Sequence, residues 1–502
     1  MLNIEKNKLT AKDYLVLPIL MKTFILSCIA IALFVLFYPP MPGVADQGDF
    51  QRVMTVVGLK EISYNSADFD SHWFKYITNN YVMVPLELER LIGIIPTTSM
   101  IYPITLARII CKMLGFQYFT TKVLAFIYSL MYILSLYMCV KYIPLKRVGT
   151  HIFLAVLSLF ILMDGGYLIW FNSLYGEPMM ILGLLFFTAS VLYFLQNIQK
   201  ISLNKILLVF TAAFFFLGAK MQCFSALPII ILLILRLPLF ENTFINRFKM
   251  SLPIACFTLL LVFYVKGIYL QINSTCGIDT QYNSVFYGIL KNSENPKKDL
   301  KILGLPEDMS VEAGKHAYLP KDQYIKYAPG SPLTKNTFNK NIDNLKLLKF
   351  YLLHPTRLIE GMEYTAAHCF DTKTSLGKYE KSDIKKYTPN FNRFTMWSDF
   401  RNSRLPKNLS FLISFYVLIA LVSVIEYIKR RNDRVEMFRI ELLWAIMIIG
   451  ILQFPMPYIG NGEADTAKQL FLFNYTFDIL FLVSCTWIFD KCYFLFLKSL
   501  NK

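Results

Sequence analysis

Charged residues are scarce in this chain, and long hydrophobic runs take their place. Only 17% of the 502 residues are Asp, Glu, Lys or Arg, whereas 55% are hydrophobic. A soluble chain of this length would need a charged surface around two or more domains, so the composition excludes an ordinary soluble protein. Apolar runs long enough to cross a bilayer recur along the chain, which predicts a polytopic membrane protein.

Motifs of several enzyme and transport classes are also missing. The sequence has no Walker lysine loop, HExxH, GxSxG or Rossmann fingerprint, so nothing supports nucleotide-driven pumping or serine hydrolysis. The nine cysteines form no CxxC pair and lie mostly in apolar runs, where a thiol acts as a small hydrophobe. No DxD-type cluster stands at a position suited to a metal, and we expect neither a metal nor another cofactor.

Acidic residues are fewer than basic ones, which gives a formal net charge of +17. The Lys and Arg residues form short clusters between the apolar runs, as positive-inside anchoring requires, so we expect no nucleic-acid partner. Lysines before the first apolar run also suit a signal peptide. That run ends in Tyr-Pro-Pro-Met-Pro without a small-x-small cleavage site, which favours a retained helix.

The apolar runs predict about ten transmembrane helices, since one crossing needs about 20 residues. The predicted spans cover residues 20–39, 118–143, 149–166, 178–196, 206–219, 223–236, 250–270, 408–428, 437–457 and 470–490. Basic clusters at alternate turns place both termini in the cytoplasm. The fifth and sixth spans are short, so we expect the tip between them, residues 218–222, to lie within the outer leaflet.

The predicted fold is therefore an all-α polytopic membrane protein in three regions. Residues 1–270 hold helices one to seven, with a first extracytoplasmic loop at 40–116. Residues 271–406 alternate turn-rich and helix-like pieces, which predicts an extracytoplasmic loop domain rather than a linker. Residues 407–502 hold helices eight to ten. In the first loop, the amphipathic stretch IYPITLARIICKML is expected to lie in the membrane interface.

Ionisable side chains gather at the predicted outer helix ends, although they come from five separate loops. A charged group near the membrane core costs about 2.5 to 3.5 kcal/mol on insertion scales, so charges in such places point to function. The polar residues at these ends are Asp46, Asp49, Arg52, Asp164, Tyr175, Glu177, Lys220, Gln222, Glu463, Asp465 and Lys468.

The first-loop acids allow two interpretations. Asp46 and Asp49 are either parts of a solvated loop, with Asp49 as N-cap of a helix that starts at Phe50, or catalytic groups. In the second case one carboxylate removes a proton from an acceptor hydroxyl while the other orients it or binds sugar hydroxyls. Arg52, one turn further on, pairs with an acid or grips a phosphate.

The later charges are also open to two interpretations. Glu177 precedes Pro178 at a helix start, where an acid also suits the helix dipole. Lys220, at the tip of two short apolar helices, requires a carboxylate or a lipid-linked phosphate as partner. Lys468 stands one turn beyond Asp465 and forms either a weak surface ion pair with it or a second contact to the same phosphate.

Five short motifs occur in a fixed order from Asp46 to Asn474: ADQGDFQRVM, FNSLYGEP, AKMQ, YNSVFYGIL followed by LGLP, and GEADTAKQLFLFN. In this order the chain resembles the bacterial glycan-biosynthesis hexose transferase (WsfD-like) family. That family lies within the GT-C class of integral-membrane glycosyltransferases.

The resemblance implies transfer of a hexose from a polyprenyl-phosphate carrier to a cell-envelope glycan or similar acceptor. The reaction would take place on the extracytoplasmic side of the bacterial cytoplasmic membrane. GT-C enzymes place an essential Asp in the first external loop, which here is Asp46 or Asp49. The implied donor phosphate-binding residues are Lys220, Lys468 and Arg52, and the implied substrate-binding residues are Tyr175, Glu177, Gln222, Glu463 and Asp465. The alternative function is a flippase or transporter of a lipid-linked or anionic solute.

Overall fold

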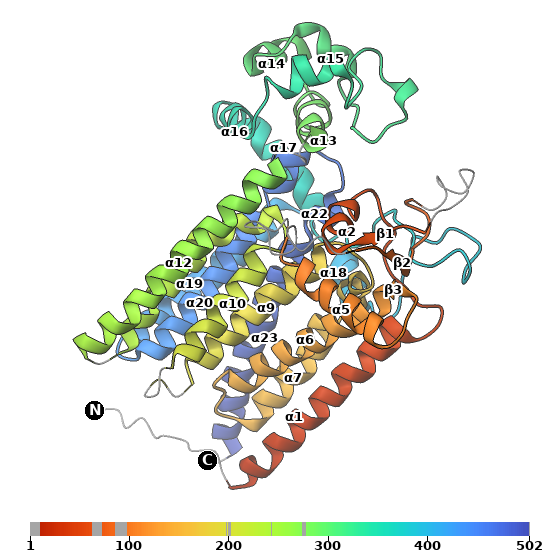
Figure 1. The fold of residues 1–502 in the computed structure, drawn as a ribbon. Coiled ribbons are helices and arrows are strands. Elements are labelled where there is room, and N and C mark those ends of the chain that lie inside the picture. Colours follow the sequence, from red (N-terminus) through yellow and green to blue (C-terminus); the bar gives the residue numbers. More distant parts are fainter. Residues whose placement is uncertain are drawn as a thin grey trace.

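The protein is a bundle of long helices with shorter elements gathered at one end (Figure 1). The computed structural model describes residues 11–62, 73–85, 98–196, 198, 202–241, 243–273 and 278–500. Within these residues, seven helices are long and apolar enough to cross a membrane, and a bent pair at 148–171 makes an eighth. The prediction of an all-α polytopic membrane protein is confirmed.

Helices occur at all ten positions that the sequence predicts. They are α1 (Ala11–Ala32, continued by η1, Leu33–Phe37), α6 (Thr121–Tyr142), α7 (Val148–Leu162), α9 (Glu177–Phe194), α10 (Leu203–Leu217), α11 (Leu227–Leu235), α12 (Phe244–Asn273), α19 (Leu409–Lys429), α20 (Arg434–Gln453) and α23 (Phe471–Leu500). Of these, α10 has 15 residues and is shorter than a full span, as expected.

The sixth span is longer than the sequence suggested. Turns η4 (Met221–Ala226) and η5 (Leu237–Phe240) flank α11, and the whole stretch of 20 residues is long enough to cross a membrane. The expectation of a short sixth helix was therefore wrong. The predicted helix ended at Arg236 because this residue is charged. In the structure Arg236 forms an ion pair with Glu441 of α20 at 2.8 Å.

Helix α9 forms the centre of the bundle. Its sequence is apolar on every side, which is the pattern of a helix buried all round. It packs against α6 and α10, while α23 packs against α20 and α7, and α1 packs against α6 and α7. In contrast, α12 carries a row of exposed apolar side chains, including Phe248, Leu252 and Phe263, as expected for a helix that faces lipid.

Helix α1 begins and α23 ends at the same end of the bundle (Figure 1). Basic residues of the neighbouring turns form ion pairs and hydrogen bonds there. Arg147, before α7, pairs with Asp490 of α23 at 2.6 Å. In the turn between α19 and α20, Arg430 pairs with Glu436 at 2.5 Å, and Arg434 donates to the carbonyl of Leu239 at 3.3 Å. The positive clusters thus share one end of the molecule, and its cytoplasmic orientation stays a prediction.

A small sheet stands at the other end of the bundle, and the sequence did not predict it. Strands β1 (Leu59–Lys60), β2 (Asn80–Met83) and β3 (Tyr118–Thr120) are antiparallel, with Leu59 opposite Met83 and Asn80 opposite Thr120. The first loop also holds α2 (Gln51–Val57) and α5 (Ile101–Met113). Helix α5 is amphipathic as predicted, since Leu106 and Ile109 are exposed whereas Ile104 is buried. Its location in the membrane interface stays a prediction.

The segment between α12 and α19 has a hydrophobic cluster of its own, built around Phe286, Leu300 and Phe350 and joined by Tyr458. Its elements are α13 (Ile278–Tyr282), η6 (Asn283–Ile289), α14 (Pro296–Leu303), η7 (Glu307–Glu312), η8 (Lys321–Gln323), α15 (Pro332–Thr334), η9 (Lys335–Asn339), α16 (Asn344–Leu353), α17 (Pro355–Ala367) and α18 (Met396–Arg404). Short helices α8 (Gly165–Leu168), η2 (Ile169–Phe171), α21 (Met456–Asn461) and α22 (Thr466–Gln469) complete the fold. The three-part domain division remains a prediction.

Candidate functional site

Asp46 shapes the loop that leads into α2. Its Oδ1 atom accepts hydrogen bonds from the backbone N–H groups of Gly48 at 2.8 Å, Asp49 at 2.9 Å and Phe50 at 3.3 Å. The expected N-cap role of Asp49 is wrong, because the N-cap of α2 is Phe50 and no side chain forms a capping hydrogen bond there. Asp46 instead fixes the turn just before the helix. Burial raises the pKa of Asp46 to about 6, although the three N–H groups act in the opposite direction.

Asp49 faces Lys468, which comes from the other end of the chain. The two side chains form an ion pair, and Asp49 keeps 30% of its side-chain surface exposed while Lys468 keeps 5%. Burial opposes ionisation of Asp49, but Lys468, Arg52 and Lys220 outweigh it and hold its pKa below the usual value. The ammonium of Lys468 also lies 4.5 Å from the centre of the Tyr175 ring, in a cation–π contact.

Tyr175 connects the first loop to the start of α9. Its hydroxyl donates to the carbonyl of Ala45 at 2.8 Å and accepts from the backbone N–H of Gln47 at 3.1 Å. Its ring packs edge-on against Phe50, with centroids 4.7 Å apart. Tyr175 thereby holds the chain on both sides of Asp46, which fixes where Asp49 points.

A second ion pair lies beside the first. Lys220, just before η4, donates to Glu177 Oε1 at 2.7 Å, and the Glu177 side chain is fully buried. Glu177 thus supplies the anionic partner that Lys220 requires. The other oxygen, Oε2, is buried without a hydrogen-bond partner in the described residues. The two ion pairs interact electrostatically. Lys220 lowers the pKa of Asp49, and Glu177 helps to raise the pKa of Lys468, which burial alone would lower.

Asp465 and Arg52 complete the group around Asp49. Asp465 adopts a left-handed backbone conformation (φ 53°) before α22, and its Oδ2 accepts from Gln47 Nε2 at 3.3 Å. The alternative of an Asp465–Lys468 surface pair is wrong, because Lys468 is buried against Asp49. Arg52 lies close enough to lower the pKa of Asp49, and its Nε is buried without a hydrogen-bond partner among the described residues.

Three residues of the predicted set are engaged elsewhere. Glu463 pairs with Lys291 and accepts from Asn292 at 3.1 Å, so it faces the segment between α12 and α19. Gln222 donates to Gln453 at 2.9 Å and to the carbonyl of Gln469 at 3.2 Å, which places it behind Lys468. Asp164 is buried and accepts from the N–H groups of Gly166 and Ser398, an arrangement that joins α8 to α18.

Sequence reasoning missed Tyr318, which approaches the site from the long segment. Loss of solvation and the carboxylates of Asp465, Asp279 and Asp49 raise its pKa. The Ala317 N–H donates to Asn283 Oδ1 at 2.6 Å, and Asn283 Nδ2 donates to Asn461 Oδ1 at 2.8 Å. Asn283 belongs to the motif YNSVFYGIL, so that motif was the available signal, whereas residues 316–318 offered none.

The geometry combines a partly exposed carboxylate with three cations from three different elements. Such a group can bind an anion and accept a proton within one small volume. Among the described residues, no three or more His, Cys, Asp or Glu side chains are grouped as ligands for a metal ion.

A family model described as the YfdI N-terminal transmembrane domain matches residues 5–502, nearly the entire chain. No curated protein and no solved structure matches the chain.

Proposed function

The chain belongs to the YfdI family of GT-C-like membrane glycosyltransferases, and from this premise we propose that it transfers a hexose from a polyprenyl-phosphate carrier to a cell-envelope glycan or similar acceptor. The reaction takes place on the extracytoplasmic side, in keeping with the WsfD-like resemblance of the motifs. The observation that carries the proposal is the meeting of the Asp49–Lys468 and Glu177–Lys220 pairs at the end of the bundle opposite the basic clusters.

In this proposal the cations bind the phosphate of the donor. Lys468 and Lys220 have carboxylates as partners, and the phosphate of a bound donor takes over part of that role. Arg52 adds its Nε–H group, which has no hydrogen-bond partner within the described part of the chain. Because the leaving group is a single phosphate, positive side chains in a poorly solvated site are enough to stabilise the charge that develops on it.

We assign the general base to Asp49 rather than Asp46. Asp46 is buried, and its Oδ1 already accepts three backbone N–H groups, so it positions the loop. Asp49 is partly exposed and can reach an incoming hydroxyl. Its pKa is held low by the same cations that bind the donor. Once the phosphate engages Lys468, that effect weakens and Asp49 becomes a stronger base.

The step balances as a substitution at the anomeric carbon. The acceptor oxygen forms a bond to that carbon while its proton passes to Asp49. The bond from the anomeric carbon to the phosphate oxygen breaks, and its electron pair leaves with the polyprenyl phosphate. Asp465 accepts a hydrogen bond from Gln47 and suits the binding of sugar hydroxyls. Gln222, which bonds the carbonyl of Gln469, suits a role in positioning Lys468, and Glu463, which pairs with Lys291, suits a role in positioning the long segment.

The test is transfer from radiolabelled polyprenyl-phosphate hexose by the purified protein. Asp49→Asn preserves the size of the side chain but removes the base, so we expect transfer to fall by about 100-fold or more. Asp383→Asn, at an exposed acid, serves as the matched control and keeps full activity. Full turnover of Asp49→Asn with normal thermal unfolding would remove the base assignment.

The same assay separates the proposal from its alternative. A flippase or transporter would bind the labelled carrier but neither transfer nor hydrolyse the sugar. Transporters usually place their polar residues near the middle of the membrane, at the interface of two repeats. The charges described above instead lie at the helix ends, which favours the transferase.

A further inference from the structure

Helix α16 exposes a row of leucines on the surface of the long segment between α12 and α19. Leu345, Leu348 and Leu352 follow one another at helical spacing, and their exposed fractions are 73%, 44% and 68%. Their shared side of the helix is the leucine face. The opposite side, with Leu347 and Phe350, is buried in the hydrophobic cluster of the segment. Single exposed leucines are common on soluble surfaces, but a contiguous row indicates a partner.

Lysines border the leucine face. Lys346 and Lys349 are exposed, and α16 contains no acidic residue. Neither lysine forms an ion pair within the described ranges. Asp343, just before the helix, instead caps it by accepting from the backbone N–H of Lys346 at 2.7 Å. An apolar row bordered by lysines is typical of a helix that lies in the surface of an anionic membrane.

The position of α16 in the fold agrees with such a surface. Figure 1 shows α16 at the level of the upper end of α12, whereas α14 and α15 of the same segment lie farther from the bundle. Helix α17 packs against both α16 and α19, and α19 is long and apolar enough to cross a membrane. Near its upper end, α12 exposes Tyr269 and Leu270, a pair suited to the edge of a bilayer.

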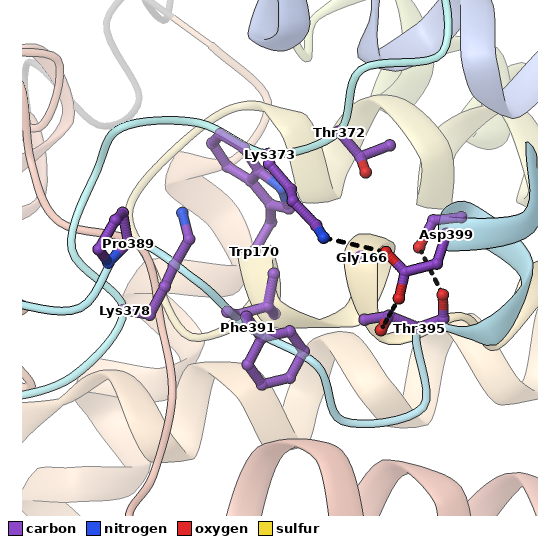
Figure 2. A pocket seen from close by; sticks show the side chains of 11 residues that line it. Gly166, Trp170, Thr372, Lys373, Lys378, Pro389, Phe391, Thr395 and Asp399 are labelled. Atoms are coloured by element: carbon purple, nitrogen blue, oxygen red, sulfur yellow. Dashed lines mark hydrogen bonds and ion pairs between the residues drawn. The ribbon is translucent and has the colours of Figure 1, made fainter. Parts of the chain in front are cut away.

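The later part of the long segment is covered by protein contacts instead. Lys373 pairs with Asp399 at 3.1 Å, and Asp399 accepts from the hydroxyl of Thr395 at 2.8 Å (Figure 2). The backbone N–H of Ser398 donates to Asp164 at 3.0 Å. The hollow that Figure 2 shows beside these groups has room only for a water-sized molecule. An external partner for the segment is therefore expected at α16.

The leucine face is too small to be a stable interface with a second copy or another protein. A helix of ten residues is about 15 Å long and about 10 Å wide, so its exposed side covers about 150 Å². A stable protein interface buries roughly 800 Å² on each partner. A lipid surface has no such requirement, because the transmembrane helices already hold the chain in the bilayer.

We propose that α16 lies in the surface of the bilayer, with its leucine face among the acyl chains and with Lys346 and Lys349 at the phosphates of anionic lipids. This contact holds the long segment at a fixed height above the membrane. Tyr318 and Lys291 belong to that segment, so the docking of α16 also positions these two residues at the candidate site. The proposal depends on the membrane location of the fold and not on hexose transfer.

The experiment places a fluorescent label on the leucine face. Leu348→Cys is made in a background without Cys256, Cys276 and Cys492 and is labelled with nitrobenzoxadiazole. The full-length protein is reconstituted into vesicles of phosphatidylcholine and phosphatidylglycerol. Bromine on the acyl chains quenches a label that lies in the bilayer, whereas iodide, present on both sides of the membrane, quenches a label in water. The background protein, treated in the same way, supplies the blank.

Ile325→Cys is the matched control, because Ile325 is an apolar residue of the same segment that is 71% exposed and lies outside α16. We expect quenching by brominated lipid to be about threefold or more stronger at position 348 than at position 325, and iodide to show the reverse order. Equal iodide quenching at both positions overturns the proposal, because α16 then faces water. Protection of position 348 from both quenchers also overturns it, because protein then covers the leucine face.

Two sets of variants test the parts of the surface. Leu345→Glu/Leu352→Glu should abolish lipid quenching at position 348 without changing thermal unfolding in detergent, since both side chains are exposed. Lys346→Gln/Lys349→Gln, or vesicles without phosphatidylglycerol, should lower lipid quenching by about twofold. Lipid quenching that survives the glutamates overturns the docking of α16. Quenching that ignores both the lysines and the anionic lipid overturns their pairing.

Discussion

At the scale of single residues, the site is organised by pairs whose members differ in burial. Lys468 is almost fully buried, whereas Asp49 is partly exposed. Removing the lysine leaves a carboxylate that water can still reach, but removing the carboxylate leaves a buried cation. Substitution of Lys468 is therefore expected to disturb the fold less than substitution of Asp49, so Lys468 is the better residue for a test of function.

We expect Lys468→Met to lower hexose transfer by about 100-fold, because one of the cations that stabilise the leaving phosphate is lost. The pKa of Asp49 should rise at the same time, since Lys468 is the strongest of the charges that hold it down. A base must be deprotonated to act, so the acidic limb of the pH–rate profile should move to higher pH. Lys326→Met removes an exposed ion pair with Asp308 and should change neither quantity.

The raised pKa of Asp46 predicts that the folded protein loses stability as the pH rises, whereas a salt-bridged acid would make it lose stability as the pH falls. The pKa of Asp46 rises from 3.8 to about 6 on folding, so the folded protein binds the proton more tightly than the unfolded chain. The resulting stabilisation is fully present below pH 3.8 and is lost as the pH rises through 6; it amounts to about 3 kcal/mol.

The measurement compares thermal unfolding of the wild type and Asp46→Asn between pH 4.5 and pH 7.5. The variant keeps an oxygen that accepts the loop N–H groups but cannot ionise. The thermal midpoint of the variant should therefore rise relative to that of the wild type as the pH increases. The exposed Asp383→Asn should show no such change. A gap for Asp46→Asn that is constant across this range would contradict the buried, protonated state.

At the scale of elements, one buried ion pair fastens α18 to α23. Arg401 and Asp478 are both fully buried and 2.5 Å apart, and Arg401 also donates to the Tyr167 hydroxyl at 2.7 Å. Tyr167 in turn donates to Asp478 at 2.5 Å. The end of the long segment is thereby attached to the helix that follows Lys468, so this contact supports the position of α22.

We expect Arg401→Met to destabilise the protein by about 3 to 5 kcal/mol, because it leaves Asp478 charged and buried without a partner. The double variant Arg401→Met/Asp478→Leu should recover much of this loss, since neither charge remains. Chemical or thermal unfolding in detergent measures both effects. Arg404→Met, on the exposed side of the same helix, should be near neutral. Additive losses in the double variant would show that the pair is not the source of the effect.

The elements also show what sequence patterns can and cannot reveal. Long apolar runs located all ten helices, because bilayer thickness imposes a length that a single sequence displays. The three-stranded sheet escaped prediction because its strands have two to four residues, too few for an alternating pattern. Its pairing of Asn80 with Thr120 also spans 40 residues and depends on tertiary contacts.

At the scale of the whole molecule, the sequence predicted which polar residues would gather but not how they pair. Charges at helix ends on the same side of a membrane can meet, and Asp49, Glu177, Lys220 and Lys468 do. The partner of Lys468 was unpredictable, because it depends on how α22 packs against the first loop. The burial of Lys378 gave no sequence signal either, since it arises only when the backbone at Lys378 packs beside Gly43.

The orientation of the molecule in the membrane is the prediction on which the proposed function depends. Lys321, in the long segment, and Arg431, in the turn between α19 and α20, are both exposed. Each is replaced by cysteine in a background without Cys256, Cys276 and Cys492, and a membrane-impermeant maleimide is applied to intact cells. Positive-inside anchoring predicts that Lys321→Cys reacts at once and that Arg431→Cys reacts only after permeabilisation.

The background protein alone is the control, because the remaining cysteines are buried or only partly accessible. The opposite labelling pattern would turn Asp49 and Lys468 toward the cytoplasm. A polyprenyl-phosphate sugar in the outer leaflet could not reach them there, and an envelope acceptor would lie across the bilayer. The pairing of these side chains would still stand as geometry, but hexose transfer on the outer face would not.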